Sequence, residues 1–127
     1  MSITVAPVGH SRILSVGTYR PKRVVPNSEI VDRIDSTDEW IVQRTGIESR
    51  RFAGDDETVI SMAKAACEIA LKRAKLTIAD IDTVILSTIS YPFQAPSAAT
   101  ELINELGNPK AAAFDISAAC AGFCYGV

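Results

Sequence analysis

Histidine and cysteine are scarce in this chain, and neither sign of charge dominates it. Its 127 residues include one histidine and three cysteines, and thirteen basic against fifteen acidic side chains leave a net charge of −2. An odd number of cysteines without C-x-x-C spacing makes neither a disulfide framework nor a zinc or redox pair, so we expect reduced thiols, a cytoplasmic protein and no metal. Because no basic stripe is present, we expect no nucleic-acid partner.

Long hydrophobic runs are also missing. The first residues, MSITVAPVGHSR, lack a basic segment followed by an apolar one, so no export signal is expected. Residues 83–100 carry no charge, but Pro92, Pro96 and several hydroxyl side chains interrupt them. A plain membrane-spanning helix is therefore excluded there, and we expect no membrane partner.

The hydrophobic pattern predicts one α/β domain. With 47% hydrophobic and 22% charged residues, the chain has the balance of a globular protein. Strands are predicted at 11–19, 82–90 and 111–116, a loop at 20–26, and helices at 27–34, 38–45, 56–76 and 96–106. This alternation predicts a mostly parallel sheet, in which the apolar run at 82–90 is buried on both faces.

Several helix ends carry recognisable capping signals. Asn27 is the predicted N-cap of the helix at 27–34. Ser36 and Glu39 form a predicted capping box, and a second box is predicted over residues 77–80. Gly46 is expected just beyond the C-terminus of the helix at 38–45.

The last thirteen residues, DISAACAGFCYGV, contain the main candidate for chemistry. An apolar run, a turn of small residues and a second apolar run predict a strand, a tight turn and a helix start, with Cys120 at or near the helix N-terminus. A helix N-terminus favours the reactive thiolate, and the carboxyl end of a sheet is where open α/β folds place ligands. Small neighbours clear the approach to the sulfur, and the N–H of Cys120 could serve as an oxyanion donor. The alternative is an ordinary buried cysteine.

Two longer segments carry a family resemblance. AFDISAACAGFCYGV resembles the active-site segment of 3-ketoacyl-acyl-carrier-protein synthase III, the condensing enzyme that initiates bacterial type II fatty-acid synthesis. STDEWIVQRTGIESRRF resembles the coenzyme-A-binding segment of that family, and SVGTYRPKRVVPNSEI resembles its N-terminal strand and loop. The resemblance implies a thiolase-like fold of two similar halves in five αβαβα layers, working as a homodimer. Residues 1–127 would be an N-terminal half-domain truncated within the nucleophile helix, with the C-terminal half absent.

The resemblance also implies roles for particular residues. Cys120 would be the nucleophile that takes an acyl group from acyl-coenzyme A before decarboxylative condensation with malonyl-acyl-carrier protein. Trp40 would stack on the adenine of coenzyme A, and Arg44 and Ser36 would contact its phosphates. Coenzyme A thioester is a substrate, so no cofactor is expected. The family's catalytic histidine and asparagine have no counterpart here, since His10 matches no motif, and these residues alone are not expected to complete the condensation.

Alternatives stay open for the function and for individual residues. A related synthase on the same fold could make a specialised metabolite or a polyketide starter, and the chain could be a non-catalytic binding fragment. Arg50 and Arg51 are either a basic rim for coenzyme A or the carrier protein, or a solvated charge pair. Cys67 and Cys124 are interpreted as core residues, and Asp115 as a structural hydrogen-bond acceptor.

Overall fold

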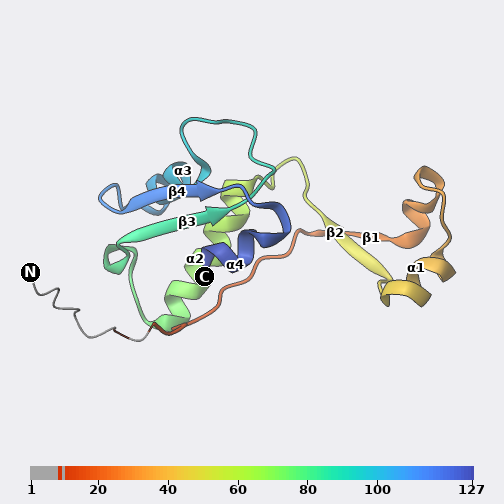
Figure 1. Cartoon of the computed structure of the whole chain (residues 1–127), viewed down its shortest axis with the longest axis horizontal. Coiled ribbons are helices and arrows are strands. Elements are labelled where there is room, and N and C mark those ends of the chain that lie inside the picture. The colour runs from red at the N-terminus through yellow and green to blue at the C-terminus, as the bar shows by residue number, and fades with distance from the viewer. Residues whose placement is uncertain (1–8, 10) are drawn as a thin grey trace, which may run out of the picture.

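The computed structural model describes residue 9 and residues 11–127, and it divides into an arm and a body (Figure 1). The arm, residues 23–52, contains β1 (Arg23–Pro26), the 3₁₀ turns η1 (Asn27–Glu29) and η2 (Val31–Arg33), α1 (Asp38–Thr45) and β2 (Ser49–Phe52). The remaining described residues form the body, with α2 (Val59–Ala74), η3 (Ile78–Asp80), β3 (Thr83–Ser87), α3 (Ala98–Leu106), β4 (Ala112–Ile116), η4 (Ala119–Ala121) and α4 (Gly122–Gly126).

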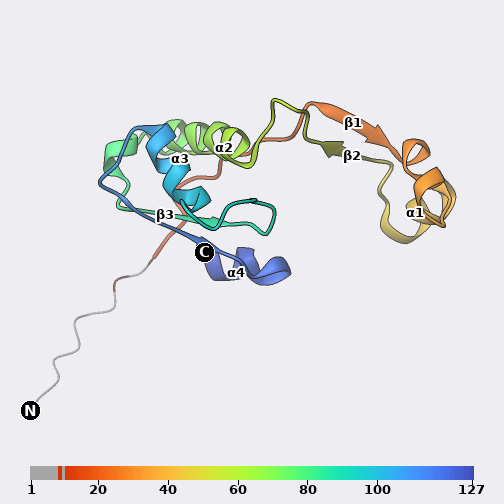
Figure 2. The same ribbon diagram turned by 90° about the horizontal axis from the view of Figure 1, so that it is seen from above.

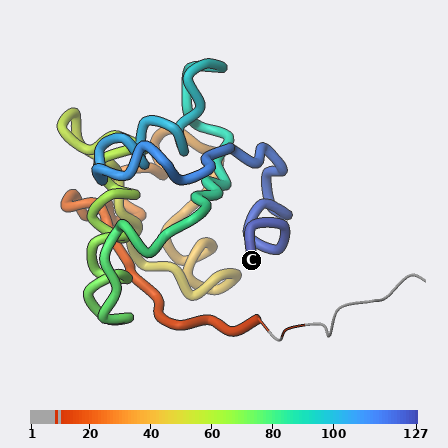
Figure 3. Tube along the Cα trace, turned by 90° about the vertical axis from the view of Figure 1, so that its left-hand side faces the viewer, coloured from red at the N-terminus to blue at the C-terminus, as the bar shows by residue number. Residues whose placement is uncertain are grey.

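The body is built around one parallel strand pair. β3 and β4 pair in register from Thr83 opposite Ala112 to Ser87 opposite Ile116. Parallel strands need a crossover connection, and α3 provides it. α2 and α3 lie on one side of the pair and α4 on the other (Figures 2 and 3). The buried apolar side chains of the body all belong to α3: Ala98, Ala99, Leu102 and Ile103.

The arm is an antiparallel ribbon with a helix at its tip. β1 and β2 pair from Arg23 opposite Phe52 to Pro26 opposite Ser49. The two 3₁₀ turns and α1 lie between these strands in the chain, at the end of the ribbon remote from the body (Figure 1). Among the described residues of the arm, only Val25 and Ile41 are buried apolar side chains.

Several predicted elements are confirmed. The helices predicted at 38–45 and 96–106 correspond to α1 and α3, and the strands predicted at 82–90 and 111–116 contain β3 and β4. Gly46 and Gly107 follow the two helices with φ of 70° and 89°, the left-handed conformation that glycine adopts most readily. The capping box at residues 77–80 is present, and the helix predicted at 56–76 is α2, which Thr58 caps.

The predicted burial of β3 on both faces is wrong for the described chain. Exposed and half-buried residues alternate along β3, and Ile85 and Phe114 are 41% and 46% exposed. The reason is that, among the helices of the described residues, only the five-residue α4 lies on the side of the strand pair opposite α2 and α3. The prediction of a mostly parallel sheet is also too broad, because the described residues form two two-stranded sheets, one antiparallel and one parallel.

The strand predicted at 11–19 is wrong, and the first strand lies in the predicted loop. Residues 11–19 are extended but unpaired with any strand, and they run along α2 instead. The Ser15 hydroxyl donates to the Ala70 carbonyl at 2.7 Å, and Arg73 donates to the Val16 carbonyl at 2.6 Å. A Cβ at Gly17 would overlap the backbone of α2, so a glycine is required at this close approach. One helix carbonyl and one helix side chain are therefore the hydrogen-bond partners of this segment, in place of a neighbouring strand.

Two capping predictions in the arm are also wrong. Asn27 does not cap a helix, because residues 27–34 form two 3₁₀ turns and its side chain is buried, 1% exposed. Thr37, not Ser36, is the N-cap of α1, and its hydroxyl accepts a hydrogen bond from the Trp40 N–H at 3.2 Å. The sequence holds Ser, Thr and Asp side by side here, and propensity alone does not decide among them.

No helix within the described part of the chain is both long enough and apolar enough to span a membrane.

Candidate active site

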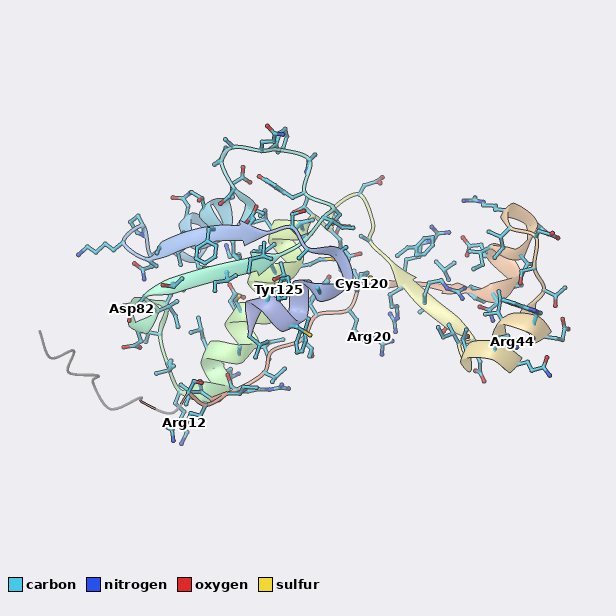
Figure 4. The ribbon with its side chains drawn as sticks, in the orientation of Figure 1. Arg12, Arg20, Arg44, Asp82, Cys120 and Tyr125 are labelled. Carbon is cyan, nitrogen blue, oxygen red and sulfur yellow. The ribbon has the colours of Figure 1, made fainter. Side chains whose placement is uncertain are left out.

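Cys120 lies in the turn that connects β4 to α4. β4 ends at Ile116, and Cys120 is the central residue of η4, two residues before the first residue of α4. The predicted strand, turn and helix start are therefore confirmed, with the difference that the turn is a 3₁₀ turn. The Cys120 side chain is exposed and lies at the carboxyl end of the parallel strand pair (Figure 4).

The backbone just before Cys120 is strained. Ala119 has φ of 43°, in the left-handed region that residues with a side chain rarely adopt. Such conformations typically cost about 1–3 kcal/mol and cluster at functional sites, where they present a side chain that a relaxed turn would not. Here the strain reverses the chain directly after the strand, so that Cys120 projects at the strand end.

Small residues and one hydroxyl seat the turn against β3. The Ser87 hydroxyl donates to the Gly122 carbonyl at 2.9 Å. A Cβ on Gly122 would stand 3.3 Å from the Ser87 Cβ, and one on Gly126 would stand 2.8 Å from the Ser87 Oγ. The glycines of α4 therefore allow this short helix to approach the strand closely.

Cys120 lines a cavity of about 430 Å³ between two loops that follow the strands. One wall runs from Ser87, the last residue of β3, to Ser90, and the other consists of Ile116 and residues of the η4–α4 turn, including Phe123. The Thr88 N–H donates to the Ile116 carbonyl at 3.1 Å, which holds the two walls together at their base. A sulfur beside an apolar hollow at the sheet end is suited to react with an acyl group that enters the hollow.

A larger cavity of about 860 Å³ lies between α2, α3 and the loop at 91–93. Its lining includes Lys64, Tyr91 and Phe93 but no cysteine or histidine. Burial raises the pKa of Tyr91 to about 12, so its phenol is neutral at physiological pH. Because this cavity offers no activated nucleophile, the smaller cavity at Cys120 is the better candidate for covalent chemistry.

The other two cysteines differ from Cys120 in setting. Cys67 is half-buried in α2, and burial, followed by the nearby Glu68 carboxylate, raises the pKa of its thiol above the usual value. A raised pKa makes the thiol less reactive, as expected of a structural cysteine. Cys124 is exposed, so its interpretation as a core residue is wrong for the described chain. The helix that carries it packs against β3 through its glycines, but its neighbours Phe123 and Tyr125 are 76% and 68% exposed.

Trp40 and Arg44 lie together on α1 at the tip of the arm. The Trp40 ring is 55% exposed, and the Arg44 guanidinium carbon lies 5.9 Å from the ring centroid. The two side chains, four residues apart, thus share one helix face, and the contact has cation–π geometry. Ser36 lies one turn away at the helix start, where its hydroxyl makes only a 3.5 Å contact with the Thr37 carbonyl. A stacked ring and guanidinium form a surface that suits a nucleotide base and its phosphates.

The structure does not bring these residues to Cys120. Cys120 lies at the carboxyl edge of the body, whereas Arg44 lies at the far end of the arm (Figure 4). The predicted site residues therefore form two groups joined by the β1–β2 ribbon. A single ligand that contacts both groups must be long and extended.

Asp115, Arg50 and Arg51 have structural partners. The Asp115 carboxylate accepts hydrogen bonds from the Ala98 and Ala99 N–H groups, both at 2.8 Å, which confirms its predicted role as an acceptor. Arg51 donates to two carbonyls just before β1, and Arg50 donates to the Asn27 side chain. Arg50 is half-buried and Arg51 is exposed, so the interpretation as a solvated pair is wrong for Arg50 but not for Arg51. His10 lies outside the described residues.

Sequence reasoning missed the roles of three residues that the structure places in important positions. Ser87 seats the Cys120 turn, Asn27 is buried at the base of α1, and Glu57 is buried between the arm and the body. The hydroxyl-rich STIS at the end of a predicted strand is a usable signal for Ser87, because side chains at that position face the site. Within residues 11–127 and at residue 9, no three histidine, cysteine, aspartate or glutamate side chains gather as metal ligands would.

No family model matches the chain, but curated proteins and solved structures do. A beta-ketoacyl-acyl-carrier-protein synthase III from Kocuria rhizophila is 50% identical over 121 residues, which are 95% of this chain and 34% of that protein. The crystal structure of the priming beta-ketosynthase from the R1128 polyketide biosynthetic pathway superposes with a TM-score of 0.89 at 46% identity, over 98% of this chain and 37% of that one. The 3-oxoacyl-acyl-carrier-protein synthase III from Aquifex aeolicus VF5 superposes with a TM-score of 0.83 at 42% identity, over 89% and 36% of the two chains.

These matches identify the described α/β structure as part of a thiolase-like condensing-enzyme fold. The chain spans about a third of the length of the curated relatives it matches. Over that third, it belongs to the beta-ketoacyl-acyl-carrier-protein synthase III family.

Proposed function

We propose that the protein containing this chain is an initiating condensing enzyme of bacterial type II fatty-acid synthesis. It transfers an acyl primer from acyl-coenzyme A to Cys120 and then condenses that primer with malonyl-acyl-carrier protein to give 3-ketoacyl-acyl-carrier protein. The observation that carries the proposal is the position of Cys120: exposed, behind a left-handed residue, and beside a cavity at the carboxyl end of parallel strands.

The first half-reaction uses groups that this chain contains. The Cys120 thiolate attacks the thioester carbonyl, forming a carbon–sulfur bond and a tetrahedral oxyanion. The oxyanion collapses, the bond to the coenzyme A sulfur breaks, and the coenzyme A thiolate leaves and takes up a proton. Backbone N–H groups at the start of the α4 turn are suited to stabilise the oxyanion, because they are fixed before the reaction begins.

The arm binds the other end of the donor. Trp40 stacks on the adenine, and Arg44 and Ser36 contact the phosphates. Coenzyme A is long and extended, with a nucleotide at one end and a thiol at the other. A ligand of that shape accounts for two groups of site residues at opposite ends of a ribbon, since binding energy gained at the arm positions the thioester at Cys120.

The second half-reaction needs groups beyond residues 1–127. By family resemblance, a histidine and an asparagine from a second, similar half stabilise the enolate formed when malonyl-acyl-carrier protein loses carbon dioxide. The enolate carbon then attacks the Cys120 thioester, and the cysteine leaves as a thiolate. The complete enzyme is a cytoplasmic homodimer with five αβαβα layers, and residues 1–127 are the N-terminal portion of its first half.

Mass spectrometry of the intact protein after incubation with acyl-coenzyme A tests the nucleophile. The expected result is one acyl adduct, located on Cys120 by peptide mapping and absent from Cys120→Ser. Cys124→Ser is the matched control, because that cysteine is also exposed and lies only four residues away. An adduct lost in Cys124→Ser and retained in Cys120→Ser would overturn the assignment.

A second candidate function is the priming of a specialised pathway. The observation in its favour is the TM-score of 0.89 with a ketosynthase that is described as priming polyketide biosynthesis. Both functions use the same acyl transfer to Cys120 and differ in the carrier protein that accepts the primer. Condensation assays with the carrier proteins of fatty-acid synthesis and of a polyketide pathway separate them, since turnover with only the polyketide carrier would favour priming.

A further inference from the structure

Asn27 holds both ends of α1 with one side chain. Its amide nitrogen donates to the Asp38 carboxylate in the first turn of α1 at 2.6 Å and to the Ile47 carbonyl just after the helix at 2.7 Å. Its amide oxygen accepts from the Arg50 guanidinium on β2. Asn27 is one of the two largest fully buried side chains of the described chain, so its amide has no access to water as an alternative partner.

Apolar packing contributes little to the placement of α1. Ile41 is the only buried residue of this eight-residue helix. A helix of that length has no appreciable stability of its own in water and depends on tertiary contacts. With one buried apolar side chain available, the hydrogen bonds of Asn27 become the main contacts that fix the direction of the helix.

The residues proposed to bind coenzyme A lie on this same helix. Trp40 and Arg44 are on its solvent-facing part, where the ring and the guanidinium stack. Their direction relative to the ribbon follows the direction of α1. Any rotation of the helix about its single buried residue would carry both side chains away from a donor whose thioester end is held at Cys120.

We propose that Asn27 is a positioning residue for the nucleotide end of coenzyme A. It touches no substrate and acts through α1, by orienting Trp40 and Arg44. The proposal rests on the proposed function of α1 as a coenzyme A contact. An amide is the group required at this position, because two N–H donors and one carbonyl acceptor match the two acceptors and one donor around it. Asn27→Asp keeps the shape but has no donors, and it places a carboxylate against that of Asp38.

Acyl transfer by the full-length protein from two donors tests the proposal. The donors are acyl-coenzyme A and the corresponding acyl-pantetheine thioester, which lacks the nucleotide. In Asn27→Asp, the KM for acyl-coenzyme A should rise about tenfold with kcat little changed, because losing both hydrogen bonds donated by the amide lowers the population of the oriented helix by about that factor. Both constants for acyl-pantetheine should stay unchanged, which also shows that the variant is folded.

Asn108→Asp is the matched control. Asn108 likewise donates from one amide nitrogen to two carbonyls, those of Ile78 and Ile81 at 2.9 and 3.0 Å, but it lies in the body. Because Asn108 has only a structural role, any loss of activity in Asn108→Asp should be equal with acyl-coenzyme A and with acyl-pantetheine. Asp38→Ala provides a second test. It removes one acceptor of the Asn27 amide by changing an exposed residue, so the buried Asn27 side chain itself stays in place. This variant should raise the KM for acyl-coenzyme A about threefold.

The outcomes distinguish the positioning role of Asn27 from the proposed binding of coenzyme A by α1. Trp40→Ala should itself raise the KM for acyl-coenzyme A, and an unchanged value would refute the role of α1 in binding coenzyme A. A raised KM in Trp40→Ala with unchanged values in both Asn27→Asp and Asp38→Ala would refute the positioning role alone. Equal losses with both donors in Asn27→Asp would also refute it, because they would show a general structural defect.

Discussion

Replacing Asp115 with asparagine should destabilise the connection between β4 and α3. The Asp115 carboxylate accepts hydrogen bonds from two consecutive N–H groups at the start of α3, those of Ala98 and Ala99, each at 2.8 Å. Both alanines are fully buried, so water does not reach their N–H groups to replace a lost acceptor. An asparagine has one oxygen acceptor, and its NH₂ group would face the second N–H.

The magnitude follows from these two bonds. A hydrogen bond to a charged group contributes about 1.5–3 kcal/mol, a neutral one contributes about 1 kcal/mol, and a negative charge at a helix N-terminus adds about 0.3–1 kcal/mol. Asp115→Asn removes one of the two hydrogen bonds to the carboxylate and the negative charge at the start of α3. The remaining hydrogen bond becomes one between neutral groups. We therefore expect a loss of about 3 kcal/mol in the free energy of unfolding.

Urea unfolding measures the global effect, and hydrogen exchange measures the local one. If the start of α3 opens locally, a loss of 3 kcal/mol corresponds to exchange of the Ala98 and Ala99 amides about 100-fold faster. Asp82→Asn is the control, because it makes the same chemical change at an exposed aspartate just before β3. If Asp115→Asn were no more destabilising than Asp82→Asn, the assigned role of the carboxylate would be refuted.

Three further changes test contacts elsewhere. Hydrogen bonds, above all the one from Tyr19, lower the pKa of Glu57. The stabilisation that this carboxylate provides should therefore be complete above about pH 4.3, its unfolded pKa, and should be lost as the pH falls through the folded pKa. Glu57→Gln should make the free energy of unfolding less dependent on pH in acid, and an unchanged dependence would contradict this. Gly17→Ala should cost about 1–3 kcal/mol in chemical unfolding, because its Cβ would overlap the backbone of α2. Gly126→Ala should slow acylation through contact with the Ser87 Oγ, and adding Ser87→Ala should restore the rate; failure of this rescue would count against the contact.

Local signals in the sequence predict much of the body. Ser97 caps the start of α3 and Gly107 follows its end, and β3 and β4 are short apolar runs, so the existence and order of these elements follow from propensity and periodicity. The position of Cys120 is predictable for the same reason. The strand, the turn of small residues and the helix start are consecutive in the chain, so no distant contact is needed to place the thiol.

The arm is harder to predict because distant contacts determine it. β1 and β2 are four residues each, and β2 reads SRRF, in which no apolar alternation is visible. Their pairing joins residues about 25 positions apart. Asn27 looks like a helix cap in the sequence, but its partners Ile47 and Arg50 are twenty or more residues away. The segment 11–19 likewise has a strand-like pattern, and its choice of α2 as a partner depends on the fold.

Glu57 lies where the arm joins the body. Its carboxylate, 7% exposed, accepts hydrogen bonds from the Tyr19 hydroxyl and the Lys22 N–H on the way into β1, and from the Gly54 N–H on the way out of β2. One buried side chain therefore ties together both connections of the arm.

Any tilt of the β1–β2 ribbon about the Glu57 junction moves the far end of the arm. Four residues of strand extend about 13 Å, so a tilt of about 5° at this junction shifts the tip by about 1 Å. A misplacement of that size can slow a reaction about 100-fold when a ligand is held at both ends. If the proposed donor is held at both Cys120 and Trp40, the angular stiffness of this one junction, which is distant from both residues, limits how accurately the donor is positioned.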